Sequence, residues 1–399
     1  MKWEKVLLGE VTDSCLGKML DQEKNRGEYQ PYLANVDVRW GNFNLDDLSE
    51  MRFEKDEQER YGLKYGDLVI CEGGEPGRCA IWKNQIPNMK IQKALHRVRV
   101  HDCLDYRYLY YWFLLAGKTG GLEQYFTGAT IKHMPGQKLK SVVIDKPPIE
   151  IQRSIADVLS SYDDLIENNQ KQIKLLEEAA QRLYKEWFVD LRFPGHENTK
   201  ITDGIPEGWR MAVLSEIASV NKESISKQYP YDYVDYIDIG AVSKGQINSV
   251  TRLSTKDAPG RAKRIAFDGD VLWGMVRPNL KSYALVFHPK ETSVFSTGFA
   301  ILHAEKVPFS FLYCHVTQDE FVSYLINCTN GAAYPAVKPS HFENAVLLVP
   351  TDMVLSKFHS LVGQMFRQAE ILEQKNQQAI EARDRLLPKL MSGEIEVEK

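Results

Sequence analysis

Short segments of this chain recur about 200 residues apart and in the same order. Gly66–Val69 reads Gly-Asp-Leu-Val, and Gly269–Leu272 reads Gly-Asp-Val-Leu, 203 residues later. Near the amino terminus Trp3 matches Trp209 at a spacing of 206. Three residues were therefore gained or lost between the amino-terminal match and Gly66. Solenoid repeats have periods of about 20–50 residues, which this spacing far exceeds. The chain therefore contains two copies of a whole domain, and two copies suit a target with two halves.

Composition bounds the class of protein without identifying it. A length of 399 residues favours two or three domains, and 43% hydrophobic residues are enough for sizeable cores. No apolar run approaches the roughly 18 residues of a membrane span, and the start lacks the apolar region of a secretory signal. The six cysteines form no C-x-x-C pair, which predicts buried free thiols in a reducing cytoplasm rather than a metal site. The net charge of −4 does not favour nucleic acid, although near-neutral blocks can carry a basic face.

The sequence changes texture along its length, and the same change occurs in both copies. Residues 1–148 and 205–350 contain short apolar or alternating runs broken by Gly, Pro, Asn and Asp, which predicts mixed strands and helices. Residues 149–192 and 351–399 read as long helices, and residues 193–204 read as a linker. We therefore expect an α+β protein with two mixed α/β blocks joined by two long helices in an internal pseudo-two-fold repeat.

Each expected helix carries one apolar stripe. In the first, apolar positions alternate steps of four and three between residues 155 and 187, which is the pattern of a coiled-coil seam. The second helix repeats this pattern 203 residues later, more weakly, with Asn376 and Arg383 inside the stripe. The principal seam positions are Leu159, Ile166, Asn169, Ile173 and Leu183 in the first helix, and Val362, Leu372, Asn376, Ala379 and Leu386 in the second.

The two stripes can bury each other if the helices pair antiparallel. Placing Asn169 opposite Asn376 also brings Trp187 opposite Phe358. In this register each pair joins a d-type heptad position to an a-type position, as antiparallel packing requires. Two buried asparagines would then fix the register. About 35 overlapping residues give a rod of roughly 50 Å, on the order of 15 base pairs of DNA. The alternative is that each helix packs separately on its own globular block.

No pattern in the chain predicts catalysis. Lys146-Pro147-Pro148-Ile149 is not the Asn/Asp-Pro-Pro-aromatic loop that an adenine methyltransferase needs. Gly117-Lys118-Thr119 resembles the end of a phosphate-binding loop, but Trp112 stands where that loop requires glycine. The histidines are scattered without ligand spacing, so we expect neither catalytic nor metal-binding residues, and a metal hydrolase is a remote alternative. Two related blocks on a rigid rod favour a binding protein that reads a split DNA site, as dimeric DNA readers do.

Several motifs resemble one known family. Pro147-Pro148-Ile149-Glu150-Ile151-Gln152, the segment Leu183–Asp190 and the tail Arg385–Ile395 are similar to conserved regions of type I restriction–modification specificity subunits. The two Gly-Asp strand starts fit the target-recognition domains of that family. One departure is that the second helix begins Pro350-Thr351-Asp352-Met353 and lacks the Pro-x-x-x-x-Gln of the first. This difference leaves room for unequal docking of the two helix starts onto partners.

The resemblance implies a function for the chain and for its partners. Two target-recognition domains would each read part of a bipartite site in double-stranded DNA, and unequal loops predict an asymmetric site. The helices would bind two methyltransferase subunits, which use S-adenosylmethionine to methylate adenine at N6. Restriction subunits that translocate DNA, with ATP and Mg, would complete the assembly, so this chain itself would be non-catalytic and cytoplasmic. Two alternatives stay open: a specificity subunit of a methyltransferase without a nuclease, and a protein–protein scaffold with no DNA role.

Candidate contact residues follow from position and chemistry. Base reading needs Arg, Lys, Asn or Gln at groove edges, and phosphate contacts need Lys or Arg. Residues of these types lie beside the rigid turns after the Gly-Asp strands and after Gly128 and Gly331: Arg78, Lys132, Arg277, Asn279, Lys281 and Lys338. For partner contact the candidates are the helix-end residues Tyr184, Trp187, Phe188, Leu386, Leu390 and Met391. Ordinary solvated charges and an intramolecular core are the respective alternatives.

Overall fold

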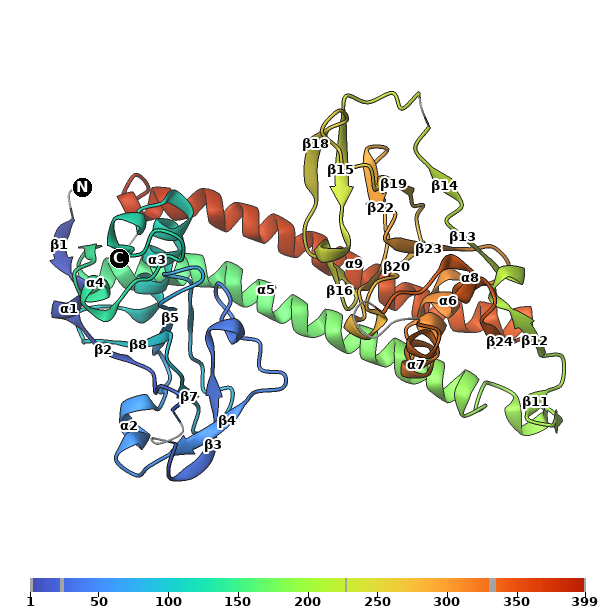
Figure 1. The fold of residues 1–399 in the computed structure, drawn as a ribbon, viewed down its shortest axis with the longest axis horizontal. Coiled ribbons are helices and arrows are strands. Elements are labelled where there is room, and N and C mark those ends of the chain that lie inside the picture. Colours follow the sequence, from blue (N-terminus) through green and yellow to red (C-terminus); the bar gives the residue numbers. More distant parts are fainter. Residues whose placement is uncertain (1–2, 22–24, 227, 330–334, 398–399) are drawn as a thin grey trace. The chain divides into compact units, whose positions relative to one another are not determined.

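The computed structural model describes residues 3–21, 25–226, 228–329 and 335–397. Packing divides the chain into unit 1, residues 1–168 with 375–399, and unit 2, residues 169–374. The long helices are α5 (Ile149–Tyr184) and α9 (Asp352–Ser392), and each contributes one end to each unit (Figure 1). Compact units therefore follow packing rather than chain order, because each helix end is buried in the core of a globular block.

The inner sheet of unit 1 has four antiparallel strands in the order β2-β8-β5-β6. These are β2 (Thr12–Leu16), β8 (Leu95–Val100), β5 (Leu68–Cys71) and β6 (Cys79–Ile81). All four residues of β5 are buried, as expected for an apolar run in the middle of a sheet. Helix α3 (Tyr106–Thr119) packs against this sheet with seven buried side chains, and its Asp105 cap accepts hydrogen bonds from the first-turn amides.

The inner sheet of unit 2 repeats this arrangement strand for strand. Its order is β13-β23-β20-β21. The strands are β13 (Ala218–Val220), β23 (Phe299–Ala304), β20 (Val271–Gly274) and β21 (Tyr283–Leu285). Helix α6 (Phe309–Val316) takes the place of α3, and α7 (Asp319–Asn327) follows it. Because β20 and α6 each begin 203 residues after β5 and α3, the repeat predicted from the sequence is confirmed as a repeat of topology.

A second matched set leads into each long helix. In unit 1, β1 (Glu4–Leu7) pairs with β9 (Val143–Lys146), which follows the short helix α4 (Gly136–Lys140). In unit 2, β12 (Arg210–Val213) pairs with β24 (Val346–Val349), which follows α8 (Pro339–Glu343). The first strand of each small sheet, β1 or β12, is followed along the chain by a single helical turn, α1 (Leu8–Val11) or η5 (Leu214–Glu216). Figure 1 shows α6, α8 and β24 gathered around the start of α9.

The outer sheets are where the two copies diverge. Unit 1 has three strands in the order β4-β3-β7, and unit 2 has five in the order β14-β19-β22-β15-β18. The unit 1 strands are β3 (Glu28–Leu33), β4 (Glu50–Phe53) and β7 (Lys90–Ile91). The unit 2 strands are β14 (Glu223–Ser224), β15 (Tyr233–Ile237), β18 (Thr251–Ser254), β19 (Ala262–Ile265) and β22 (Ser293–Ser296). β3 and β15 each have one antiparallel and one parallel neighbour, so β4-β3-β7 corresponds to β18-β15-β22 at one edge of the larger sheet. At the chain position of β19, unit 1 has the helix α2 (Glu57–Tyr61) instead.

The helix seam can be followed within each unit. In unit 2, Ile173 and Leu372 share a buried cluster, and the rings of Trp187 and Phe358 have centroids 5.8 Å apart. Both pairs were predicted by the antiparallel register, so α5 and α9 run antiparallel in this unit. In unit 1, Leu159 is buried with Leu387, while Leu386 is only partly buried, so the seam position expected at Leu386 moves by one residue.

The remaining seam residues differ in how far the structure defines them. Ile166 and Ala379 are buried in unit 1, and Val362 is buried in unit 2 with Leu183 partly buried against the same cluster. Asn169 and Asn376 are both buried. Asn169 belongs to unit 2 and Asn376 to unit 1, and their pairing stays a prediction.

Residues 193–204, predicted as a linker, lie within unit 2 and are more ordered than a plain linker. Helix α5 continues as a π-helical turn, η3 (Lys185–Val189), and η4 (His196–Asn198) follows. The strands β10 (Ile201–Thr202) and β11 (Ile205–Pro206) then form a short antiparallel hairpin. Three of the six cysteines, Cys71, Cys79 and Cys314, are buried free thiols as expected, whereas Cys103 is exposed.

Candidate nucleic-acid interface

Three connecting segments adjoin in each unit, and two of them carry all six of the predicted DNA contacts. The hairpin segment, residues 35–44 or 239–248, begins with a 3-10 turn: η1 (Asn35–Asp37) or η6 (Ile239–Ala241). In unit 2 this segment contains the short strands β16 (Val242–Ser243) and β17 (Gln246–Ile247). The strand loop follows β5 or β20 and spans residues 72–78 or 275–282. The approach segment precedes α4 or α8 and covers residues 127–135 or, within the described residues, 335–338.

The hairpin segments have the same backbone frame in both units. The amide of Gly41 donates to the carbonyl of Cys79 at 3.0 Å, and the amide of Gly245 donates to Tyr283 at 2.8 Å. Gly41 and Gly245 have left-handed φ angles of 77° and 82°, a conformation that glycine adopts without strain. A Cβ at Gly41 would meet the Tyr110 hydroxyl, and one at Gly245 would meet the Glu177 carboxylate. In both units, the left-handed φ angle and the close packing at this turn therefore favour glycine.

The strand loop and the approach segment are joined in the same way in both units. The Met134 amide donates to the Glu72 carbonyl at 2.7 Å, and the Val337 amide donates to Met275 at 2.9 Å. A β-bridge pairs Gly73 with His133, and the corresponding bridge in unit 2 pairs Val276 with Ala336. The two units thus hold three loops on one repeated frame while the side chains on those loops differ.

In unit 1 the predicted contacts have unequal freedom. The Arg78 guanidinium donates to the backbone and side-chain oxygens of Asn35, both at 3.1 Å, and to Glu75 at 3.1 Å. These bonds tie the strand loop to the hairpin segment, so the geometry favours a positioning role for Arg78 rather than groove contact. Lys132 is exposed on the approach segment, with its ammonium 3.8 Å from Glu123 and over the ring of Phe126.

In unit 2 four predicted contacts lie on two adjoining loops. Arg277 and Lys281 both have left-handed backbone conformations, with φ of 52° and 53°, and they flank the turn η7 (Pro278–Leu280) that carries exposed Asn279. The Arg277 amide donates to the Pro335 carbonyl at 2.8 Å. Lys281 pairs with Asp319 at 2.6 Å, and exposed Lys338 is the first residue before α8. A non-glycine residue held at positive φ is strained, and such strained residues are common in functional loops. The turn around Gly331 lies outside the described residues.

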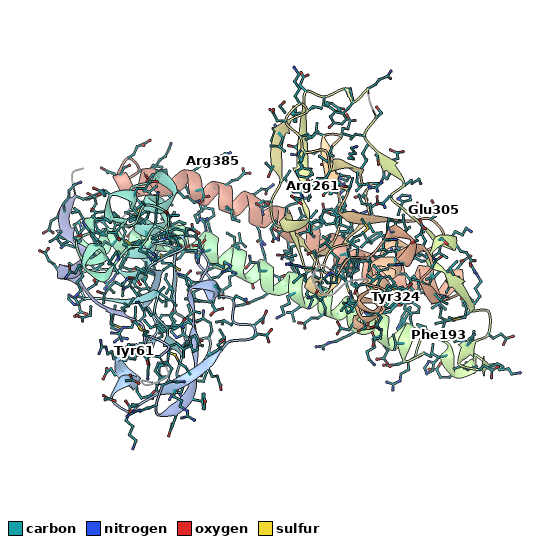
Figure 2. All side chains as sticks on the ribbon, in the orientation of Figure 1. Tyr61, Phe193, Arg261, Glu305, Tyr324 and Arg385 are labelled. Carbon is teal, nitrogen blue, oxygen red and sulfur yellow. The ribbon has the colours of Figure 1, made fainter. Side chains whose placement is uncertain are left out.

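Sequence reasoning missed the tips of the hairpin segments. Arg39 and Asn42 are exposed in unit 1; in unit 2 exposed Gln246 stands at the position of Asn42, and exposed Lys244 directly precedes Gly245. Their guanidinium, amide and ammonium groups are of the type that contacts bases or phosphates. Figure 2 labels Arg261, which forms an ion pair with Asp238 at the base of the unit 2 hairpin segment. The available signal was the spacing of 204 residues between Gly41 and Gly245.

The residues predicted to touch partner subunits lie in the cores instead. Tyr184, Trp187 and Phe188 are 4–7% exposed, and the Phe188 ring lies 4.8 Å from Phe358 and 5.0 Å from Phe311. Burial raises the pKa of the Tyr184 hydroxyl, which lies 2.8 Å from the His315 ring. Leu390 and Met391 are buried in unit 1, where Leu386 is partly buried. The expected partner contact is therefore corrected: these side chains stabilise each unit because the helix ends pack on the globular blocks.

The site has the chemistry of recognition. Its groups are donors and acceptors on repeated loops, which can bind and orient a nucleic acid. Among the residues that the structure describes, no three His, Cys, Asp or Glu side chains gather closely enough to hold a metal ion. In the same described part of the chain, no helix is both long and apolar enough to cross a membrane.

Fold and site together define a duplicated two-unit protein that presents unlike polar loops on like frames. The family described as "Type I restriction modification DNA specificity domain" matches residues 1–178. The specificity subunit of the type I enzyme MjaIX of Methanocaldococcus jannaschii is 29% identical over 351 residues, covering 84% of this chain and 78% of that protein. The MjaVIII specificity subunit of the same organism is 24% identical over 410 residues, covering 99% and 93%.

A solved structure has the same fold. The type I restriction–modification S subunit from M. genitalium superposes with a TM-score of 0.55 at 16% identity, covering 98% of this chain and 96% of that one. Over nearly its whole length the chain is similar to type I restriction–modification specificity subunits.

Proposed function

We propose that this chain reads a bipartite, asymmetric site in double-stranded DNA, with one half recognised by each unit, and that it scaffolds the enzymes that act there. The observation that carries the proposal is the pair of loop frames. Identical backbone hydrogen bonds hold the hairpin segment at Gly41 and at Gly245, while the neighbouring exposed side chains differ between the units. A constant frame with variable polar side chains is suited to reading two different sequences.

Roles can be assigned to groups on the loops. Asn42, Gln246 and Asn279 each offer an amide donor and acceptor, the pair that recognises adenine in the major groove. Arg39 and Arg277 can bind guanine through two parallel hydrogen bonds, whereas Lys132, Lys244 and Lys338 suit phosphate contacts that position the protein without reading sequence. These assignments are supported by exposure and loop position.

Chemistry is supplied by other subunits in this proposal. Methyltransferase subunits, two in the full assembly, would bind S-adenosylmethionine and modify adenine, and restriction subunits would use ATP and Mg. This division is supported by the similarity to specificity subunits and by the recognition chemistry of the loops. The free thiols Cys71, Cys79 and Cys314 are consistent with a reducing cytoplasm.

Co-expression of the chain with its partner methyltransferase, followed by methylome sequencing, tests the proposal. We expect methylated adenines within one motif made of two different half-sites separated by unread bases. A symmetric or uninterrupted motif contradicts the two-reader assignment, and the absence of sequence-specific methylation favours a scaffold without a DNA role. Purifying the complex shows whether a translocating nuclease is also bound.

Arg277→Ala tests the contribution of one loop. Loss of a bidentate base contact is expected to weaken specific DNA binding by about 1–3 kcal/mol and to relax preference in only the half-site read by unit 2. Arg182→Ala is a matched control, because Arg182 is an exposed arginine on α5 in the same unit. Unchanged affinity and preference in the Arg277 variant would remove this residue from the interface.

A further inference from the structure

Unit 1 has an open hollow at the start of α5. Its volume is about 630 Å³, and its lining residues are Trp3, Glu4, Cys103, Lys146, Pro147, Pro148 and Ile149. Trp3 is only half-buried there, and its indole N–H donates to the Met391 carbonyl at 3.1 Å. A Lys146–Glu4 ion pair of 2.9 Å closes one side, and exposed Cys103 lies on another. The hollow therefore combines an apolar indole with an electrically balanced rim.

A buried glutamine holds the walls of the hollow in place. The Gln152 amide group donates to the Pro147 carbonyl at 2.7 Å and to the Cys103 carbonyl at 3.1 Å. Its side-chain oxygen accepts from the Asp105 amide at 2.8 Å. Gln152 is fully buried, so these bonds are made in a low-dielectric setting and fix the two segments firmly. At the equivalent position unit 2 has buried Leu355, which cannot make these bonds.

The equivalent tryptophan of unit 2 is covered by the chain itself. Trp209 follows Trp3 by 206 residues and is 7% exposed. The Phe193 ring packs on it with centroids 4.7 Å apart, and Pro194 follows directly. Phe193, labelled in Figure 2 beyond the end of α5, reaches this place because the chain turns back at Leu191, where φ is 56°. The Arg192 amide closes this turn by donating to the Glu186 carbonyl at 2.8 Å.

Unit 1 ends α9 with a matching hydrogen bond, but its left-handed residue is Gly393, with φ of 73°, one repeat position earlier than Leu191, and no aromatic residue follows in residues 394–397. The Ile395 amide donates to the Lys389 carbonyl at 3.2 Å, which matches the Arg192 bond 203 residues earlier. The position equivalent to Phe193 is Glu396, and it is exposed. In unit 1 one face of the Trp3 indole therefore stays uncovered, whereas in unit 2 the equivalent Trp209 indole is covered by Phe193.

We propose that the Trp3 hollow binds an aromatic side chain followed by proline, presented by the methyltransferase subunit. The proposal rests on the function proposed above. An aromatic ring on Trp3 would reproduce the Phe193–Trp209 packing, and such rings are common anchors at the centre of interfaces. A second copy of this chain is a poor donor, because its own Phe193 is 3% exposed. The methyltransferase thus docks at the α5 start of unit 1 through a contact that unit 2 does not offer.

Cys103→Trp tests the proposal by filling the hollow, since Cys103 is exposed and its backbone contacts are unaffected. Lys306→Trp is the matched control, because Lys306 is exposed at the equivalent position of unit 2. We expect Cys103→Trp to weaken binding of purified methyltransferase by about tenfold or more, and Lys306→Trp to leave it unchanged. Equal affinity of both variants and the wild-type chain overturns the proposal.

Alkylation of Cys103 by iodoacetamide, followed by mass spectrometry, provides a readout in the unmodified protein. We expect Cys103 to react readily in the isolated chain and slowly in the methyltransferase complex. Full reactivity in the complex, with motif-specific methylation intact, overturns the docking site and leaves the proposed function standing. Loss of motif-specific methylation in the wild-type complex overturns the function instead. Protection that depends on the concentration of the isolated chain assigns the hollow to a second copy and overturns the methyltransferase as occupant.

Discussion

The Gly-Asp pairs that revealed the repeat have a structural cause at the level of single atoms. The Asp67 carboxylate accepts from the Lys64 amide at 2.7 Å, and Asp270 accepts from the Phe267 amide at the same distance. Both aspartates are buried, and each binds one basic side chain from the neighbouring strand. In unit 1 that side chain is Arg99, bound through two bonds of 2.7 Å, and in unit 2 it is His303 at 2.7 Å. Local sequence predicted the aspartates, but their partners lie about 30 residues away on another strand.

His303→Arg is expected to stabilise unit 2. Burial raises the pKa of Asp270 above its usual range, and a single hydrogen bond joins this carboxylate to the His303 ring, whereas Asp67 accepts two from Arg99. A guanidinium stays charged and binds a carboxylate through two bonds, which should add about 1 kcal/mol. Hydrogen exchange of the β20 amides measures the effect, and the β5 amides are the internal control. If exchange in β20 of the variant is no slower than in the wild type, the prediction is contradicted.

Glu177→Gln is expected to remove a pH dependence from unit 2. Burial raises the pKa of the Glu177 carboxyl from 4.5 to about 7, opposed by the charge of Lys244. The folded state therefore keeps a proton that the unfolded chain has lost, and stability falls as pH rises between these values. At pH 8 the glutamine variant should be more stable by about 1–3 kcal/mol, and near pH 4 it should match the wild type. Urea unfolding at both pH values measures the free energy of unfolding. Glu178→Gln, at an exposed neighbouring position, is the control and is expected to leave it unchanged at both pH values.

At the scale of elements, the long helices were predictable and the outer sheets were not. A sustained step of four and three fixes one face of a helix, so Trp187 could be matched with Phe358 from the sequence. Short outer strands carry no such signal: residues 57–61 form α2, whereas the corresponding part of unit 2 leads into β19. Tertiary packing decides between helix and strand in segments of this length.

Arg383 shows how the weaker seam of α9 is compensated. This arginine lies in the predicted stripe, and its guanidinium binds Asp163 of α5 and Asp384. Asp163 also accepts a hydrogen bond of 2.6 Å from the Tyr111 hydroxyl of α3. The polar seam position thus connects three helices of unit 1. The heptad pattern of a single helix could not predict that α3 contributes to this network.

Asp163→Ala is expected to destabilise unit 1 by about 2 kcal/mol, because it removes the main partner of a mostly buried charge. Replacing both residues, Asp163→Ala with Arg383→Leu, should recover much of that loss, since an apolar residue suits the seam. Exposed Asp164→Ala is the neighbouring control. Thermal unfolding of Asp163→Ala, of Arg383→Leu and of the double variant gives the coupling energy. Additive losses in the double variant would contradict a shared network.

At the scale of the whole molecule, sequence could predict the duplication and the family but not the loop frames. The spacing of 203 residues relates strands, helices and seams, because the same hydrogen-bonded topology is used twice. The hairpin segments follow a spacing of 204, and they share only three residues: Val38 with Val242, Gly41 with Gly245 and Asn44 with Asn248. Their equivalence becomes visible only through the backbone bonds that position them. Side chains chosen to read different bases are expected to differ, so similarity is weakest where function is concentrated.

Helix length is expected to set the gap between the two half-sites. Inserting seven residues after Gln172 and seven after Leu372 adds one heptad to each helix and preserves the apolar stripe. Each insertion lengthens its helix by roughly 10.5 Å, about three base pairs. The methylated motif should keep both half-sites and gain about three unread bases, as measured by methylome sequencing. Insertion in α5 alone is the control and should abolish methylation, because the seams no longer match. An unchanged gap in the double insertion contradicts a spacer role for the helices.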